Sequence, residues 1–228
     1  PSSSSPYGED CRACWTVPED YRLVGIDASG LELRMLAHYL NDEGYTNEIL
    51  NGDIHTANQN LAGLESRDQA KTFIYALLYG AGDAKLGSVV GRGRAHGKGL
   101  RQRFFDGLPS FKNLTDRVQR EAKSGFLKAL DGRRLTVRSE HAALNTLLQG
   151  AGAIVMKKAL VILNDKIIKH GWDAKFVANV HDEWQIECHL DDAVDVGNAG
   201  VHAIKEAGCM LNLNCPLDGD YKVGENWS

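Results

Sequence analysis

The segment KFVANVHDEWQIECHL, residues 175–190, decides the fold because its apolar and polar residues alternate on both sides of a polar centre. Alternation with a period of two is typical of a β-strand with one buried face. Two such runs separated by His181, Asp182 and Glu183 predict a β-hairpin with these residues at its tip. The sequence therefore predicts two adjacent carboxylates at the end of an antiparallel strand pair.

A second strand is predicted near the start of the chain, where RLVGIDAS, residues 22–29, reads as a short buried strand ending at Asp27. Residues 1–20 are polar and proline-rich and should be loop or extended chain. Helices are predicted over about 30–40, 46–62, 67–79 and 141–169, with a mostly helical basic region to about 128 and a strand within 130–139. Strands near both ends predict an α+β fold, with an antiparallel sheet and packed helices interrupted by a mostly helical domain.

The composition is that of a folded protein, since the 228 residues are 43% apolar and 25% charged. The chain has no uncharged apolar run of 18 residues and no signal-peptide pattern, which predicts a cytoplasmic protein without a membrane partner. Its five cysteines contain one C-x-x-C pair and no second pair, which favours reduced thiols over a structural zinc site.

The net charge of −4 hides a strongly uneven distribution. Residues 85–138 hold 14 Lys and Arg against 4 Asp and Glu, a local charge of +10. Seven glycines lie between Gly80 and Gly99, and the aromatic residues of the block are Phe104, Phe105 and Phe111. Such a segment suits phosphates and unstacked bases, whereas a solvated basic face would explain the charges equally well.

Asp27 and Asp182 are the strongest candidates for a metal site. A carboxylate at the end of a buried strand is unfavourable unless it is paired or binds a cation. Two carboxylates brought together from different strands suit Mg²⁺, which takes one or two carboxylates together with substrate phosphates. The alternative is that each aspartate only caps a turn.

The stretch RDQAKTFIYALLYGAG, residues 67–82, places two cations and then two aromatic residues on one helix face. Ser66 and Gln69 form a capping box that starts this helix, and Gly80 ends it. The stripe consists of Arg67, Lys71, Tyr75 and Tyr79. It suits a nucleotide, although exposed cations and core tyrosines are the ordinary explanation. Arg67 opposes the helix dipole and is unfavourable there without an anionic ligand.

Two further sets of polar residues allow a structural and a functional interpretation. Glu32 completes a capping box with Ser29, yet it also suits a position beside the sugar of a nucleotide. Asn145 and Gln149 share a helix face with Gly152, which suits close approach by the edge of a duplex or by another helix.

Three segments, in this order, resemble the three polymerase motifs of family A DNA polymerases, which comprise bacterial DNA polymerase I and the replicative enzymes of short-tailed phages. They are GIDASGLELRMLAHYL, RDQAKTFIYALLYGAG and VHDEWQIE. SPYGEDCR, NGDIHT and DGRRLTVRSEHAALNTLLQGAGA extend the resemblance over most of the chain. DASGLELR with Gly30, and Tyr75, resemble the phage branch in particular.

The resemblance implies DNA-templated DNA synthesis, in which a dNTP donates a nucleotidyl group to a primer 3′-OH by a two-metal mechanism. Asp27 and Asp182 would be catalytic and would hold two Mg²⁺ ions, with the Ala28 carbonyl as a further ligand. Mn²⁺ can substitute for Mg²⁺ in this role. Glu183 would lie near the site without being an essential ligand.

The nucleotide contacts that the resemblance implies lie on the helix at 67–79 and near it. Arg67 and Lys71 would bind the triphosphate with the help of His55, and Lys71 would donate a proton to the departing pyrophosphate. Tyr75 would stack near the incoming base and sugar, and Glu32 would exclude ribonucleotides by crowding the 2′ position.

The resemblance also implies DNA contacts. Tyr79 and Gly80 would abut the templating base pair, Asn145 and Gln149 would probe the minor groove, and His181 would contact the primer end.

The implied domains are a palm formed by residues 1–40 and 131–228, with the fingers at 41–130 between its parts. Family members carry a thumb, and often an exonuclease, upstream of SPYGEDCR, and this chain has neither. We therefore expect a fragment or one subunit of a split enzyme, which needs that N-terminal portion in cis or as a separate subunit. Its partners would be primer-template DNA and dNTP, and it would act in the cytoplasm, that of an infected bacterial host if it is phage-encoded.

Two other functions remain open. A single-subunit RNA polymerase shares the palm, but Glu32 and Tyr75 disfavour it because an RNA polymerase must leave room for the 2′-hydroxyl. A catalytically silent DNA-binding remnant would need neither the carboxylate pair nor the phosphate-binding cations.

Overall fold

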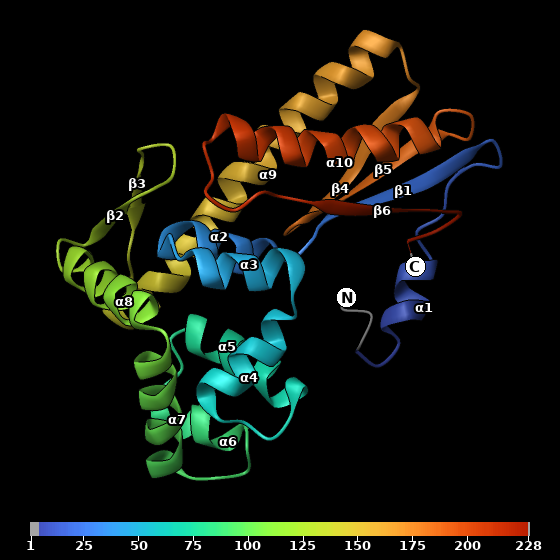
Figure 1. The fold of residues 1–228 in the computed structure, drawn as a ribbon. Helices are drawn as coiled ribbons and strands as arrows, with labels where there is room; N and C mark the ends of the chain where they lie inside the picture. Colours follow the sequence, from blue (N-terminus) through green and yellow to red (C-terminus); the bar gives the residue numbers. More distant parts are fainter. Residues whose placement is uncertain (1–4, 228) are drawn as a thin grey trace. The chain divides into compact units, whose positions relative to one another are not determined.

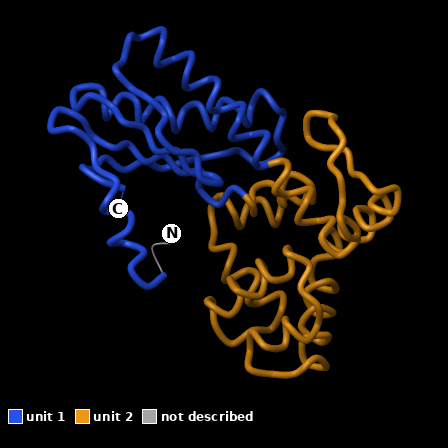
Figure 2. The backbone as a smooth tube through the Cα atoms, turned by 180° about the vertical axis from the view of Figure 1, so that it is seen from behind, with its two compact units in different colours: residues 1–31, 152–228 blue, residues 32–151 orange. Residues whose placement is uncertain are grey.

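The computed structural model describes residues 5–227, which divide into two compact units (Figure 2). Unit 1 consists of the described residues up to Leu31 and from Gly152 onward, and unit 2 is Glu32–Ala151. These boundaries differ from the predicted ones at 40/41 and 130/131. The first boundary falls at the start of helix α2 (Leu31–Leu40), directly after the turn at Ser29 and Gly30. The second falls within helix α9 (Ala143–His170), where no loop or turn marks it. The assignment of palm and fingers stays a prediction.

Unit 1 is built on a four-stranded antiparallel sheet in the order β4-β5-β1-β6 (Figure 1). Its strands are β1 (Tyr21–Ala28), β4 (Ala174–Val180), β5 (Glu183–His189) and β6 (Gly219–Gly224). The sheet and the surrounding helices confirm the predicted α+β class. The predicted hairpin is present as β4 and β5, which pair up to Val180 and Glu183 beside the turn.

The two faces of the sheet differ in chemistry because side chains alternate along β1. Val24 and Ile26 are fully buried. Helix α10 (Ala193–Met210) packs on this side, and a Cβ at Gly200 would come within 2.3 Å of the Ile26 side chain. Asp27 points to the opposite face, which also carries its register partner Glu183. The sequence analysis assigned no element to α10.

The N-terminal segment is more ordered than predicted. Residues 8–13 form helix α1 (Gly8–Ala13), although 1–20 were expected to be loop or extended; residues 1–4 lie outside the described residues. Glu9 and Asp10 in the first turn and Arg12 in the last turn complement the helix dipole, which explains the short helix in a proline-rich segment.

Helix α9 (Ala143–His170) confirms the long helix predicted over 141–169 and follows a 3₁₀ turn, η1 (Glu140–Ala142). By length and composition alone, the helix from 140 to 170 is able to cross a membrane. Core helices of soluble proteins meet the same criterion, and 44% of its most apolar window is buried.

Unit 2 is mostly helical and contains a small hairpin before it ends within α9. Its elements are α2 (Leu31–Leu40), α3 (Glu43–Asn51), α4 (Ile54–Ala62), α5 (Arg67–Leu78), α6 (Asp83–Ser88), α7 (Arg94–Gly107), α8 (Pro109–Ala122), β2 (Phe126–Lys128) and β3 (Arg134–Thr136). The helical region predicted over 46–62 is present as two helices, α3 and α4. The chain breaks at Gly52, and the Asp53 side chain accepts a hydrogen bond from the His55 amide to start α4.

The aromatic residues of the basic block form the core of unit 2. Phe104 packs edge-to-face against Phe73 at 5.7 Å and against Phe111 at 5.3 Å between ring centroids. Phe104 and Phe111 are 0% and 1% exposed, so they are not available to stack on bases. The prediction that these two phenylalanines contact unstacked bases is therefore wrong, because folding buries their apolar surface.

Candidate active site

The two predicted metal ligands lie at one end of the sheet in unit 1. Asp27 is the penultimate residue of β1, and Asp182 occupies the turn between β4 and β5. The Ala28 amide donates a hydrogen bond of 3.0 Å to the Asp182 carbonyl, which ties this turn to the end of β1. His181 forms the turn with Asp182 and has a left-handed φ of 56°. The sheet thus brings together side chains that are 155 residues apart in sequence.

Burial and like charges perturb Asp27 at this end of the sheet. Burial is the larger cause, and together with the nearby charges of Asp182, Glu183 and Asp220 it raises the pKa of Asp27 to about 6. Asp220 lies directly opposite Asp27 on β6. Asp220 was not among the predicted site residues, although the polar–apolar alternation of GDYKVG was a signal for this strand.

This arrangement fits a hard divalent cation. Within residues 5–227, neither Asp27 nor Asp182 has a Lys, Arg or His partner within ion-pair distance. In the same residues, no group of three or more His, Cys, Asp and Glu side chains is placed to hold a metal. Two carboxylate ligands would leave coordination positions of the ion for water and phosphate oxygens, which is the arrangement that Mg²⁺ prefers. The Ala28 carbonyl stays a predicted ligand.

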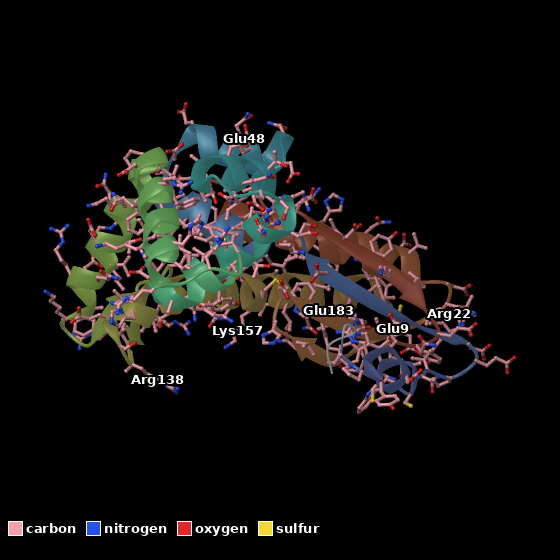
Figure 3. All side chains as sticks on the ribbon, turned by 90° about the horizontal axis from the view of Figure 1, so that it is seen from below. Glu9, Arg22, Glu48, Arg138, Lys157 and Glu183 are labelled. Carbon is pink, nitrogen blue, oxygen red and sulfur yellow. The ribbon has the colours of Figure 1, made fainter. Side chains whose placement is uncertain are left out.

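Glu183 is held by other side chains of unit 1. The Trp227 indole N–H donates a hydrogen bond of 2.8 Å to Glu183 Oε1, and the Gln185 amide donates to the same oxygen. Glu183, labelled in Figure 3, lines a cavity of about 690 Å³ together with Asp27 and Asp220. These hydrogen bonds orient Glu183, whose role near the site stays a prediction.

The repulsion around Asp27 gives a stability prediction. Because the folded state raises the pKa of Asp27 from 3.8 to about 6, folding becomes less favourable as the pH rises between these values. Asp27→Asn removes the charge. For a partly buried group that solvent still screens, relief of about 1 kcal/mol should raise the melting temperature by about 2–4 °C at pH 7.5 without divalent ions. The gain should disappear below about pH 4, where wild-type Asp27 is protonated in both states.

Circular dichroism melts of both proteins over this pH range measure the difference. Asp165→Asn on the exposed side of α9 is the matched control, because it removes the same charge away from the cluster. A melting temperature of Asp27→Asn below that of wild type at pH 7.5 would contradict the predicted repulsion. A gain in melting temperature that does not depend on pH would contradict it as well.

In unit 2, helix α5 presents the predicted nucleotide-binding stripe. Ser66 Oγ accepts a hydrogen bond of 3.2 Å from the Gln69 amide, so the helix begins where the capping box predicted. One side of α5 is buried through Ala70, Phe73, Ile74, Leu77 and Leu78. Arg67, Lys71 and Tyr79 are exposed, and Tyr75 is half-buried.

Arg67 already has an anionic partner. Its Nε lies 2.7 Å from Asp53 Oδ2, an oxygen that also accepts a hydrogen bond of 2.9 Å from Thr56. The Arg67 guanidinium lowers the pKa of Asp53, and the carboxylate raises the pKa of Arg67 in turn. The sequence analysis expected an external ligand to offset the helix dipole at Arg67, whereas the structure shows a side chain of the same unit doing so.

His55 follows this aspartate on α4 and lies in the same cluster. Burial lowers its pKa, and the charges of Arg67 and Lys71 lower it further. Its ring centroid is 6.4 Å from that of Tyr75. The four residues that the resemblance assigns to the triphosphate and base are therefore neighbours within unit 2.

The C-terminal end of α5 adjoins the predicted sugar contact. The Tyr79 hydroxyl donates a hydrogen bond of 3.4 Å to Glu32 Oε2. Gly80 follows with a φ of +77°, and a Cβ there would lie 2.2 Å from the His141 carbonyl oxygen. Both the left-handed backbone and the close approach require glycine at this position.

The predicted minor-groove residues lie on α9. Gln149 is exposed and Asn145 is half-buried; the Asn145 side-chain oxygen is buried, with no hydrogen-bond partner among the described residues. A Cβ at Gly152 would lie 3.3 Å from the Leu31 side chain. Close helix–helix packing therefore explains this glycine, one of the two alternatives that the sequence left open.

Residues 2–228 match the sequence profile described as DNA polymerase family A. The chain is 43% identical over 261 residues to the DNA-directed DNA polymerase of Escherichia phage T7, a match that covers all of this chain and 37% of that protein. It is 32% identical to DNA polymerase I of Aquifex aeolicus, which covers 96% of this chain and 41% of the relative. The chain therefore spans well under half the length of these relatives.

The fold is also similar to a solved structure, the POL domain of Pol1 from M. smegmatis in complex with DNA primer-template and dNTP. The TM-score is 0.89 at 24% identity, and the match covers 99% of this chain and 43% of that one. At this identity the likeness concerns the fold alone. The family profile matches nearly the whole length of the chain, and the chain therefore belongs to DNA polymerase family A.

Proposed function

We propose that this chain is the catalytic palm and fingers portion of a DNA-directed DNA polymerase. It transfers a nucleotidyl group from a dNTP to the 3′-OH of a primer. One observation carries the proposal: in a family A chain, the sheet brings Asp27 and Asp182 together with no cationic partner among the described residues. DNA binding alone would not need such a cluster.

Family A polymerases are metal-dependent in general, and Asp27 and Asp182 are the residues that would hold two Mg²⁺ ions, with Mn²⁺ as a substitute. When bound, the ions lower the pKa of the attacking 3′-hydroxyl and neutralise the charge that develops on the leaving oxygen. The Ala28 carbonyl would add one oxygen ligand. Glu183 stays in place through Trp227 and Gln185 and orients the turn.

The residues of unit 2 would bind the incoming nucleotide. Arg67 and Lys71 contact the triphosphate, and Lys71 donates a proton to the departing pyrophosphate. The Nε of Arg67 donates a hydrogen bond to Asp53, which leaves the two terminal nitrogens of the guanidinium to donate to phosphate oxygens. Burial and the charges of Arg67 and Lys71 lower the pKa of His55, and its ring would assist in binding the triphosphate.

Tyr75 and Glu32 would set the choice of sugar. We propose that Tyr75 stacks near the base and sugar while Glu32, hydrogen-bonded to Tyr79, fills the space of a 2′-hydroxyl. DNA contacts would come from Tyr79 and Gly80 at the templating pair. Asn145 and Gln149 would contact the minor groove, and His181 the primer end.

The chain covers 37% of the phage relative, so full activity would need the remaining portion of such a protein in cis or as a second subunit. Its partners would be primer-template DNA and dNTP. Because the phage relatives carry the name DNA-directed DNA polymerase, we place the activity in the cytoplasm of an infected bacterial host.

A comparison of sugars tests the proposed function. We expect the complete enzyme with Mg²⁺ to extend a primer with dNTPs at least tenfold more efficiently than with rNTPs. Glu32→Ala should reduce this preference by about tenfold, since one steric contact is worth about 1–3 kcal/mol. Primer extension on gels with each nucleotide set measures both ratios. Equal or preferential use of rNTPs by wild type would favour the RNA polymerase alternative.

A further inference from the structure

Asn58 is a polar side chain that the proposed nucleotide site does not use, and it is completely buried in unit 2. Its side-chain oxygen accepts a hydrogen bond of 3.2 Å from the hydroxyl of Tyr45, which is 4% exposed. Its side-chain nitrogen is buried as well and has no hydrogen-bond partner among the described residues. A buried donor without a partner is unfavourable and rare in folded proteins, so we expect a partner for this amide.

A second unsatisfied polar atom belongs to the same helix. Nδ1 of His55 is buried and, within residues 5–227, has no hydrogen-bond partner. His55 and Asn58 are three residues apart on α4. Such residues are neighbours on a helix surface, with about 5–6 Å between their Cβ atoms. An amide NH₂ group only donates, whereas Nδ1 of a neutral imidazole can accept, so the two atoms are complementary.

The surroundings connect this pair to the proposed nucleotide site. The ring centroid of His55 is 6.4 Å from that of Tyr75. Burial raises the pKa of Tyr45, and Tyr75 raises it in the same direction, which places the two phenols near each other. Burial and two neighbouring cations lower the pKa of His55, which favours the neutral ring with a single N–H.

We propose that Asn58 is a positioning residue for His55. One bridging water accepts a hydrogen bond from the Asn58 amide and donates one to Nδ1 of His55, so the ring carries its hydrogen on Nε2. Tyr45 holds the amide in this orientation, because its hydroxyl is bonded to the amide oxygen.

This inference rests on the proposed function, in which His55 helps to bind the triphosphate. With its hydrogen on Nε2, the ring presents a donor to phosphate oxygens. The other tautomer would present a lone pair at Nε2, which repels them. Asn58 would therefore act on dNTP binding through His55 and without touching the nucleotide.

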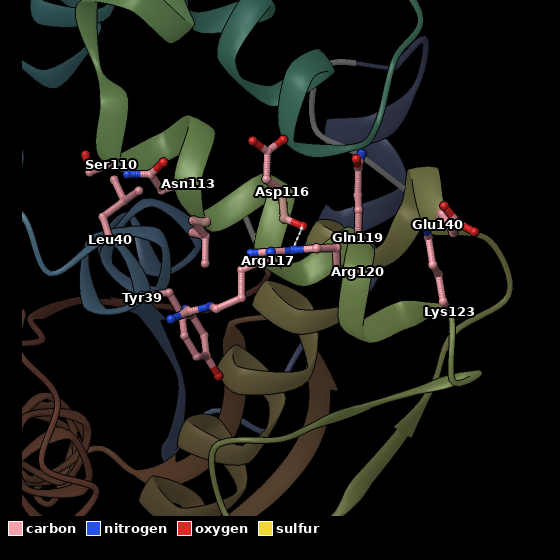
Figure 4. Close-up of a pocket in the computed structure, with 11 residues that line it drawn as sticks. Tyr39, Leu40, Ser110, Asn113, Asp116, Arg117, Gln119, Arg120, Lys123 and Glu140 are labelled. Carbon is pink, nitrogen blue, oxygen red and sulfur yellow. Dashed lines mark hydrogen bonds between the residues drawn. The ribbon is translucent and has the colours of Figure 1, made fainter.

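Tyr39 supplies the matched control variant. Its hydroxyl is also buried and has no hydrogen-bond partner in the part of the chain that the structure describes. Tyr39 belongs to α2, however, and lines a cavity of about 790 Å³ together with residues of α8 (Figure 4). The described lining of that cavity contains no residue of α4. Tyr39→Phe therefore removes a buried hydroxyl of unit 2 without changing the surroundings of His55.

NMR of the complete enzyme, labelled with ¹⁵N at histidine, reads the tautomer of His55 at about pH 8, where imidazole is neutral. His55→Gln assigns the signals by removing them. We expect hydrogen on Nε2 in wild type and in Tyr39→Phe, and both tautomers in Asn58→Leu. In Asn58→Asp we expect a proton on Nδ1, because a carboxylate accepts and does not donate.

Two results would overturn the proposal. One is hydrogen on Nδ1 in wild type, which would mean that the amide is turned the other way. The other is the wild-type tautomer in Asn58→Leu or in Asn58→Asp. Wild type and Asn58→Asp decide the question if Asn58→Leu does not fold.

Kinetics of dNTP incorporation separate positioning from a structural role. Loss of one hydrogen bond should raise the KM for dNTP about three- to tenfold in Asn58→Leu, with kcat within about twofold of wild type. In a His55→Ala background the same substitution should have no further effect. An equal rise in KM in both backgrounds would overturn the positioning role. The expected tautomers together with no primer extension by wild type would count against the polymerase proposal alone.

Discussion

Asp182→Asn should reduce Mg²⁺-dependent primer extension by the complete enzyme by about a thousandfold or more. The substitution keeps the size and the turn geometry but removes one of two negative oxygen ligands of the proposed metal site. Charge stabilisation by such ions is worth several kcal/mol in the transition state, and each 1.4 kcal/mol is a factor of ten in rate. Single-turnover incorporation of one dNTP measures the loss directly.

Two comparisons make this result specific. Asp191→Asn removes an exposed carboxylate that follows β5 and should leave extension within about twofold of wild type, as expected for surface changes. Primer-template affinity of Asp182→Asn should stay near that of wild type, because an aspartate does not attract phosphates. Near-normal extension by Asp182→Asn would contradict the proposed metal site. Binding of primer-template by wild type without binding of Mg²⁺–dNTP would instead favour the silent DNA-binding remnant.

Lys71→Ala should lower kcat by about 10²–10⁴, the range typical of a positioned general acid. Lys71 lies one helical turn after Arg67 on the exposed side of α5, beside His55. Removing its ammonium group takes away both a phosphate contact and the proposed proton for pyrophosphate. Pre-steady-state kinetics separate the effect on kcat from that on dNTP binding.

Lys71→Arg distinguishes the two roles. Arginine keeps the positive charge but does not give up its proton at neutral pH. We therefore expect dNTP affinity close to that of wild type together with a kcat still at least tenfold low. Full recovery of kcat in Lys71→Arg would show that charge alone is needed. Lys85→Ala, an exposed lysine on α6, should have little effect on either parameter.

Features encoded locally were predictable from the sequence. The alternation around His181 predicted the hairpin, and the apolar run before Asp27 predicted β1. Ser66 and Gln69 predicted the start of α5 because a capping hydrogen bond involves only neighbouring residues. The proximity of Asp27 to Asp182 was predictable once both residues were assigned to strand ends of one sheet.

Features that depend on tertiary contacts were not predictable. Asp220 joins the carboxylate cluster through the pairing of β6 with β1, and no local pattern specifies that partner. Phe104 and Phe111 were taken as possible base contacts, but Phe104 packs against both Phe73 and Phe111, and both residues are buried. Gly52 is a local helix-breaking signal that the prediction of helix over 46–62 did not use.

The ion pair between Asp53 and Arg67 fixes the arginine side chain before any nucleotide binds. Because Asp53 engages only the Nε, both terminal nitrogens of the guanidinium are left to donate hydrogen bonds. In the proposed nucleotide site, part of the entropy of ordering this long side chain would already be lost in the free protein, so less of it would be lost on binding. The side chain that starts α4 would in this way preorganise a residue of α5.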